Sequence, residues 1–290
     1  MSTSQAYRAG LRPLLLALVA LASGCELFSP SPDPTPDAGS TADAGTPPSN
    51  PPGEPVPDAG TTVNAPRFEH YIRRQPYPRM VLEVDGWGGY TPTASVADRL
   101  QRGLLGILDK ESVEVRVDQA FPGKGADHAW SNQELLRLAE ETGKLEVPVG
   151  TIKLHVLLVD GHSAMDTQDG KVLGLAFPWT HLVLFRQTLD QVCGKGPILT
   201  PPACVEAELG VWVHEVGHQL GLVNNGLVMV GNHQDASHGA HDTNDRCIMY
   251  WAYEGSGIID ALGRGLFGDA PNLGFDEACM ADLNAVKTRP

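Results

Sequence analysis

The fold of this chain is decided by the stretch HEVGHQLGLVNNG, residues 214–226. It holds two histidines four residues apart, His214 and His218, with Glu215 directly after the first. Residues four apart lie on one face of a helix, so both imidazoles can bind one zinc ion at about 2.0–2.1 Å. Glu215 is rotated by about 100° from His214 and can take a proton from a zinc-bound water molecule without binding the metal. The pattern therefore predicts zinc-dependent hydrolysis of a peptide bond.

The sequence around this motif predicts a long and mostly buried helix. Residues 204–222 carry apolar side chains on both sides of the histidine pair, and Gly221 is well placed to end the helix. The HExxH pattern also arises by chance on ordinary helices, where the histidines are surface residues. Buried histidines, in contrast, need hydrogen-bond partners or a metal. The apolar flanks therefore favour the metal site.

The same stretch, together with CIMY at residues 247–250, resembles the metzincin clan of zinc peptidases. That clan has the pattern HExxHxxGxx, then a third ligand, and later a turn that contains methionine. The resemblance covers roughly residues 65–290, and only residues 214–249 match its motifs. It implies an α+β fold with a twisted mixed sheet, an active-site helix, and a small C-terminal subdomain that holds the methionine turn and a final helix. It also implies roles for five residues: zinc ligands His214 and His218, general base Glu215, bend Gly221 and floor of the site Met249.

The third zinc ligand is where the sequence departs from the clan. Asn224 stands at the usual position, and its neutral carbonyl oxygen is a poor zinc ligand. In archaemetzincins the third histidine lies six residues before a cysteine and eight before the turn methionine. His241, Cys247 and Met249 keep that spacing, which implies an insertion of about 17 residues before the ligand. The resemblance therefore implies His241 as the third zinc ligand.

Other polar residues of this loop stay open as alternatives. His233 or His238 could replace His241, or Asn224 could bind the metal after all. His233, Asp235 and His238 could also bind a second ion such as calcium or zinc. Polar contacts that orient the imidazoles are the more ordinary role for these three residues.

Three later residues are further candidates for the same site. In a glutamate-zincin pattern Glu277 would be the third ligand, but its context matches poorly and the bend at Gly221 argues against it. Tyr250 and Tyr253 follow the methionine, where a phenol could stabilise the oxyanion of a tetrahedral intermediate. Packing is the expected role of both tyrosines.

Length, composition and charge limit the class of protein. The chain has 290 residues, of which 42% are hydrophobic and 19% are charged, enough for one well-filled domain. The formal net charge is −14, whereas phosphate binding needs a basic surface. We therefore expect no nucleic-acid partner.

The N-terminal residues predict export. Residues 1–24 combine two arginines with an apolar run too short to span a bilayer. The following ASGC resembles a bacterial lipobox, with Ala22 where leucine is usual. It implies a signal peptide over residues 1–24 and a lipid anchor at Cys25 in the bacterial cell envelope. Ordinary cleavage, which would leave a secreted protein, is the alternative.

The rest of the chain divides into a tether and one domain. Residues 25–65 are rich in proline, alanine, glycine and aspartate and hold almost nothing apolar, so we expect a disordered tether. Residues 66–290 form the predicted peptidase domain. Four cysteines remain there, and an oxidising compartment favours disulfides. We expect the pairs Cys193–Cys204 and Cys247–Cys279, although two other pairings are open.

Alternating apolar patterns within the domain predict an α+β order of elements. The expected strands cover residues 79–87, 112–119, 151–161, 172–179 and 180–189. The expected helices cover residues 93–110, 131–143, 204–222 and 276–287.

Together these patterns predict an exported, membrane-tethered, zinc-dependent endopeptidase. It would be a monomer, with Zn²⁺ as its cofactor, Glu215 as its catalytic residue and a peptide or protein as its substrate. The alternative is a non-catalytic binding lipoprotein on the same fold, in which the metal is structural or lost.

Overall fold

The computed structural model describes residues 67–168, 170–178, 180–195, 201–255, 257–259, 262 and 274–288. All of these belong to one compact unit, Asp43–Pro290. The predicted signal peptide, lipid anchor and tether lie outside the described residues. No helix in the described part of the chain is long and apolar enough to cross a membrane.

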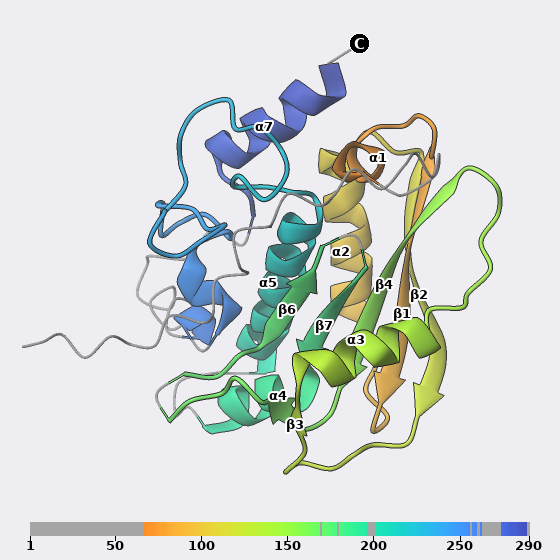
Figure 1. Cartoon of the computed structure of the whole chain (residues 1–290), viewed down its shortest axis with the longest axis vertical. Helices are drawn as coiled ribbons and strands as arrows, with labels where there is room; N and C mark the ends of the chain where they lie inside the picture. The colour runs from red at the N-terminus through yellow and green to blue at the C-terminus, as the bar shows by residue number, and fades with distance from the viewer. Residues whose placement is uncertain are drawn as a thin grey trace, which may run out of the picture. The chain divides into compact units, whose positions relative to one another are not determined.

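A five-stranded mixed sheet forms the centre of this unit (Figure 1). The order of strands across the sheet is β2-β1-β4-β7-β6. Neighbouring strands are parallel except for the edge strand β6, which runs antiparallel to β7. The strands are β1 (Arg79–Trp87), β2 (Ser112–Phe121), β4 (Thr151–Val159), β6 (Gly174–Phe177) and β7 (His181–Phe185). A separate pair joins β3 (Ala129–Trp130) to β5 (His162–Ser163).

The position of each strand in the sheet follows from its pattern of side chains. β1 and β4 are buried along almost their whole length, as central parallel strands must be when helices cover both faces. β2 alternates between buried and exposed side chains at first and lies at the edge. β6 is the other edge strand, and Pro178 follows directly after it, where a missing N–H breaks no ladder.

Helices cover both faces of the sheet. α2 (Ala94–Ile107) and α5 (Pro201–Gln219) lie side by side on one face, where their apolar side chains share a core with β1 and β4 (Figure 1). α3 (Asn132–Glu141) lies over the other face, where Leu135 packs with Trp130 in a smaller core. Further helices include α1 (Phe68–Ile72), α4 (Arg186–Lys195), the 3₁₀ helix η1 (Trp251–Glu254) and α7 (Glu277–Thr288).

The predicted α+β fold with its twisted mixed sheet is therefore confirmed. One of the expected elements needs correction. The strand expected over residues 180–189 ends at Phe185, because the chain turns there into α4, whose Leu189 and Cys193 are buried one turn apart. The short helix α1 was not predicted.

The four cysteines of the domain are thiols in the structure. Cys247 and Cys279 are both buried, and their Sγ atoms lie 3.8 Å apart. Cys193 and Cys204 are also neighbours, because a side-chain contact between them contributes to the raised pKa of the Cys193 thiol, after burial itself. The expected pairs are therefore adjacent, and the disulfides themselves stay a prediction.

Candidate metal centre

Helix α5 carries the first two imidazoles of the site. His214 and His218 project from the same face of its last turns, and both side chains are buried. Their Nε2 atoms face each other at 3.1 Å. Two ligand atoms at about 2.0–2.1 Å from one tetrahedral zinc ion would lie about 3.3–3.4 Å apart. The helical pair is therefore spaced for a shared metal ion.

The third imidazole comes from the loop that follows α5. The ring of His241 lies 5.3 Å from that of His214 and 5.0 Å from that of His218, measured between ring centroids. It is buried like the other two. The structure thus brings together the three histidines that the sequence analysis selected as metal ligands.

Backbone carbonyls fix two of these rings from behind. Nδ1 of His214 lies 2.6 Å from the carbonyl oxygen of Ile248, and Nδ1 of His241 lies 2.5 Å from that of His238. When Nδ1 carries the proton and donates it to a carbonyl, Nε2 keeps its lone pair free for a metal. This orientation is the one that metal-binding histidines need.

A fourth polar group, Glu254 at the end of η1, reaches the same point. Its carboxylate and the three imidazole nitrogens all lie within 4.8 Å of one another. Burial alone would raise the pKa of Glu254, but the three imidazoles beside its carboxylate outweigh burial and hold the pKa well below its usual range. The sequence analysis missed this residue. An acid five residues after Met249 was a weak signal, since nothing in the sequence shows that η1 turns back to the site.

Glu215, the predicted general base, is completely buried beside the histidines. Neither of its carboxylate oxygens has a hydrogen-bond partner among the described residues. Burial, and then the charge of Glu254, raise the pKa of Glu215 well above its usual range. A carboxyl group with a raised pKa is suited to accept and return a proton near neutral pH.

Edge strand β6 passes directly over this carboxylate. A Cβ atom at Gly174 would collide with the Oε1 atom of Glu215 and lie 2.7 Å from its Cγ. Only glycine lets the strand approach so closely. β6 and the predicted base are therefore in contact.

The methionine turn lies beneath the helix. Met249 is fully buried, and a Cβ atom at Gly217 would collide with its sulfur atom. Tyr253 is also buried, and its hydroxyl donates to the carbonyl oxygen of Asp245 at 2.5 Å. Tyr250 is partly exposed and packs against Tyr253. The hydroxyl of Tyr253 is thus already engaged, as expected for a packing residue.

The alternative third ligands lie elsewhere. Asn224 is exposed, has a φ of 60°, and donates its side-chain amide to Gln234 at 3.0 Å. His238 pairs with Asp235 at 2.6 Å. Glu277 is exposed in the first turn of α7. None of these residues belongs to the group of possible metal ligands that the three imidazoles form.

His233 belongs to a second buried group. Its Nδ1 atom lies 2.6 Å from Asp242, and its Nε2 atom lies 3.0 Å from Asp282 on α7. Burial alone would lower the pKa of His233, but its hydrogen bonds to Asp242 and Asp282 raise it. Both ring nitrogens are therefore engaged with carboxylates. Since Asp242 directly follows His241, this group ties the third imidazole to the C-terminal helix.

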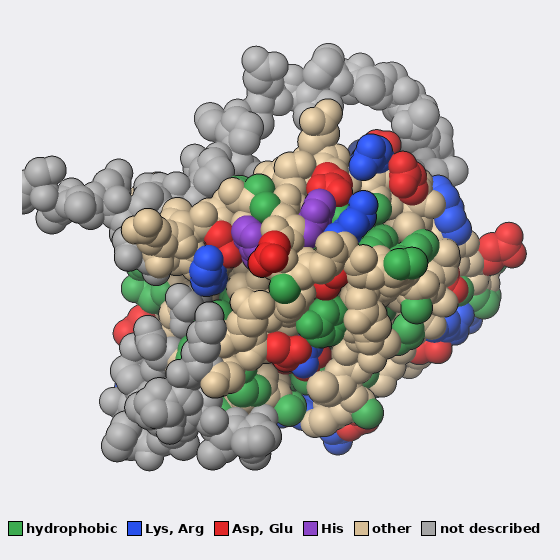
Figure 2. Space-filling view, turned by 90° about the horizontal axis from the view of Figure 1, so that it is seen from below, with side chains coloured by type: hydrophobic (Ala, Val, Ile, Leu, Met, Phe, Trp, Pro, Cys, Tyr) green, Lys and Arg blue, Asp and Glu red, His purple; other side chains and the backbone are tan. Residues whose placement is uncertain are grey.

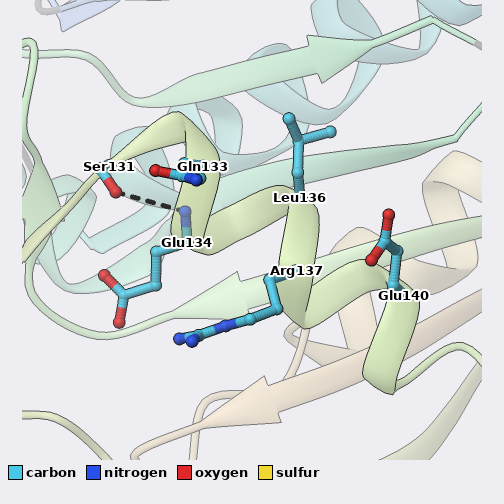
Figure 3. A pocket seen from close by; sticks show the side chains of 6 residues that line it. All are labelled: Ser131, Gln133, Glu134, Leu136, Arg137 and Glu140. Atoms are coloured by element: carbon cyan, nitrogen blue, oxygen red, sulfur yellow. Dashed lines mark hydrogen bonds between the residues drawn. The ribbon is translucent and has the colours of Figure 1, made fainter.

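Other surface features do not compete with this centre. A hollow of about 570 Å³ lies along the outer side of α3, lined by Ser131, Gln133, Glu134, Leu136, Arg137 and Glu140 (Figure 3). It shares no residue with the histidine group. On the face shown in Figure 2, acidic and basic side chains are interspersed with apolar ones, so charge alone marks no site there.

No family model matches the chain, and no curated protein matches it. Several solved structures are similar to it, among them the following two. One is archaemetzincin from Methanopyrus kandleri, with 18% identity, a TM-score of 0.45, and coverage of 73% of this chain and 97% of that chain. The other is a zinc-dependent peptidase from Methanocorpusculum labreanum, with 18% identity, a TM-score of 0.42, and coverage of 70% and 100%.

Proposed function

We propose that this protein is an exported, membrane-tethered, zinc-dependent endopeptidase. One observation carries the proposal: three buried imidazoles from α5 and the following loop converge beside Glu215, a buried carboxylate with no hydrogen-bond partner among the described residues. A buried polar group left without a partner costs free energy, so such a group points to function rather than stability.

The residues of the site fit zinc. Three imidazole nitrogens are a common ligand set of catalytic zinc, and the Nε2 spacing of the helical pair suits one tetrahedral ion. Zinc bound there would supply a Lewis acid and lower the pKa of water toward 7. His214, His218 and His241 would hold the ion. Glu215 would take the proton from the attacking water and return it to the leaving amine.

A peptide substrate is supported by the edge strand β6. No further strand pairs with its outer side in the described part of the chain. An extended peptide can add to such an edge through backbone hydrogen bonds, and its side chains then occupy pockets on alternate sides. Because Gly174 of β6 touches Glu215, a peptide paired with this edge would lie next to the proposed base.

A second candidate is a non-catalytic binding lipoprotein with a structural metal. The position of Glu254 favours it, since four protein ligands around one ion are typical of structural zinc sites. The two candidates differ in what Glu215 does, because a structural site needs no general base.

Casein hydrolysis by the purified chain tests the proposal. We expect about one zinc ion per chain, and hydrolysis that is lost on chelation and in Glu215→Ala. Glu277→Ala, a change at an exposed glutamate, is the matched control and should keep the wild-type rate. His241→Ala should lose zinc. Retained hydrolysis in Glu215→Ala would eliminate the assigned base. A zinc-loaded wild-type chain that hydrolyses no casein would leave the binding protein as the better candidate.

Export and anchoring are proposed from residues 1–25 of the sequence alone. In a bacterial host, Cys25→Ser should move the protein from the membrane fraction to the soluble exported fraction. An unchanged distribution would contradict lipidation at that cysteine.

A further inference from the structure

The carboxylate of Glu254 lies directly beside the three imidazoles of the metal-binding centre. Its Oε1 atom is 2.9 Å from Nε2 of His241, 3.4 Å from Nε2 of His218 and 3.8 Å from Nε2 of His214. One oxygen atom therefore faces all three of the nitrogens that would bind zinc.

These distances describe the fourth corner of a tetrahedron. Ligand atoms at about 2.0–2.1 Å from a tetrahedral zinc ion are about 3.3–3.4 Å from one another. The three distances from Oε1 lie on both sides of that value, and the Nε2 atoms of His214 and His218 are 3.1 Å apart. A carboxylate oxygen is also an ordinary zinc ligand. Both the spacing and the donor type fit a fourth ligand.

The backbone around Glu254 is held in place from two sides. Its carbonyl oxygen accepts a hydrogen bond from the N–H of Leu173 at 2.9 Å, and Gly255 forms a bridge with Val172. These contacts attach the end of η1 to the segment that leads into β6. On the other side, the buried side chain of Tyr253 is bonded to Asp245. The carboxylate is therefore directed to the centre by tertiary contacts.

Glu254 differs from the three histidines in its access to water. Its side chain is 26% exposed, whereas those of His214, His218 and His241 are at most 8% exposed. A partly exposed carboxylate can turn away into solvent at low cost, because it keeps its hydration. Buried imidazoles fixed by carbonyls have no such freedom.

We propose that Glu254 is a fourth protein ligand that closes the metal site in the resting protein and leaves it when another ligand enters. The inference rests on the proposed function, since it needs a metal ion held by the three imidazoles. A zinc site with four protein ligands has no free position, whereas a catalytic site keeps one open. Glu254 would thus act as a gate supplied by the domain itself.

Cobalt in place of zinc tests the gate without any activity assay. The full chain is loaded with Co²⁺, and its visible absorption is followed while azide is added as a competing ligand. If Glu254 holds the fourth position most of the time, azide binds wild type at least about 10-fold more weakly than it binds Glu254→Gln. The same variant should bind zinc at least about 10-fold more weakly in competition with a chromophoric chelator.

Two further variants control the experiment. Glu254→Asp keeps the charge but shortens the side chain by one methylene group, so it should bind azide as Glu254→Gln does. Glu140→Gln changes an exposed acid on α3 and should behave as wild type. Circular dichroism of each variant shows that the fold is intact before spectra are compared.

The outcomes distinguish failure of the Glu254 gate from failure of the proposed zinc site. Equal azide affinities in wild type and Glu254→Gln would overturn the gate and leave the zinc site standing. Wild-type azide affinity in Glu254→Asp would also overturn it, because charge and not ligation would then account for the effect. A wild-type chain that binds neither cobalt nor zinc would overturn the proposed function and the gate together.

Discussion

The protein buries carboxylates in several places, and two of these places have contrasting surroundings. In the middle of the sheet, Glu83 and Asp85 on β1 are fully buried. Glu83 lies 2.6 Å from Nζ of Lys153, and Asp85 lies 2.9 Å from Nε2 of His155. Each also accepts hydrogen bonds from backbone N–H groups. Glu215 on α5 is just as buried, but neither of its oxygens has a hydrogen-bond partner among the described residues.

This difference has a direct effect on the pKa of the two kinds of acid. For Asp85, burial alone would raise the pKa, but hydrogen bonds from His155 and from the backbone of Gly143 outweigh it and lower the pKa. For Glu215, burial raises the pKa with no hydrogen bond to oppose it. A paired acid stabilises the sheet, whereas an unpaired acid stays available for a proton. Burial by itself therefore does not identify the site.

The largest effect we expect comes from Glu215→Gln. Hydrolysis should fall by about 10²–10⁴-fold, since that is the usual contribution of a general base. Stability of the metal-free chain should not fall, because the amide removes a buried carboxylate that has no partner. Rates on casein and urea unfolding of the metal-free chain measure the two quantities. If the variant loses stability as well as activity, then Glu215 stabilises the fold as the paired acids of β1 do, and the contrast between them is wrong.

Asp85→Asn should give the opposite result. It replaces a buried carboxylate that accepts hydrogen bonds from two backbone N–H groups and sets an amide N–H₂ group against those donors, so the free energy of unfolding should fall by about 1.5–3 kcal/mol. Zinc affinity of the folded fraction should stay at the wild-type value. Urea unfolding and a chelator competition test this, and a large loss of zinc affinity without a loss of stability would contradict it.

Local patterns in the sequence were enough for the sheet and for half of the site. The predicted strand over residues 79–87 has the same bounds as β1, because its strand-forming residues are neighbours in the chain. The predicted helix over residues 131–143 corresponds to α3, where Ser131 accepts the N–H of Glu134 as the N-cap. His214 and His218 share a helix face because the helical period places them there. Each of these depends only on neighbours in the chain.

The other half of the site depends on contacts between distant residues. The spacing of His241 to Cys247 and Met249 selects it, but its ring reaches His214 and His218 only because the loop after α5 returns to that helix. Glu254 reaches the centre only because its backbone bonds to Leu173, 81 residues earlier in the chain. A pattern of neighbouring residues contains no such information. The residues of long-range origin are therefore the ones that sequence reasoning found weakly or missed.

Asp282→Asn tests whether long-range pairing also supports the site. Asp282 on α7 lies 3.0 Å from His233, whose other ring nitrogen bonds to Asp242 next to the third imidazole. Removing this charge should lower the free energy of unfolding by about 1.5–3 kcal/mol, the usual range for a hydrogen bond to a charged group.

The loss in this variant should depend on pH in a defined direction. Burial alone would lower the pKa of His233 in the folded state. Its hydrogen bonds to Asp242 and Asp282 outweigh burial and raise the pKa above the ordinary value of 6.5. The stabilisation is therefore fully present below pH 6.5 and is lost as pH rises through the folded pKa. Urea unfolding of the metal-free wild type and variant should show the largest difference at about pH 5–6. A difference that grows with pH would contradict a protonated His233.

The smallest effect should come from Asn224→Gly. Asn224 occupies the position where the metzincin pattern has its third ligand, but the structure turns it to the surface at a φ of 60°. Its side-chain amide donates a hydrogen bond to Gln234, so it is a paired polar group, like the acids of β1 and unlike Glu215. Glycine keeps the left-handed backbone without strain, whereas alanine would add a cost of its own. Stability should change by no more than about 0.5 kcal/mol, and zinc affinity should not change at all. A loss of zinc in Asn224→Gly, with zinc retained in His241→Ala, would return the third ligand to the usual metzincin position.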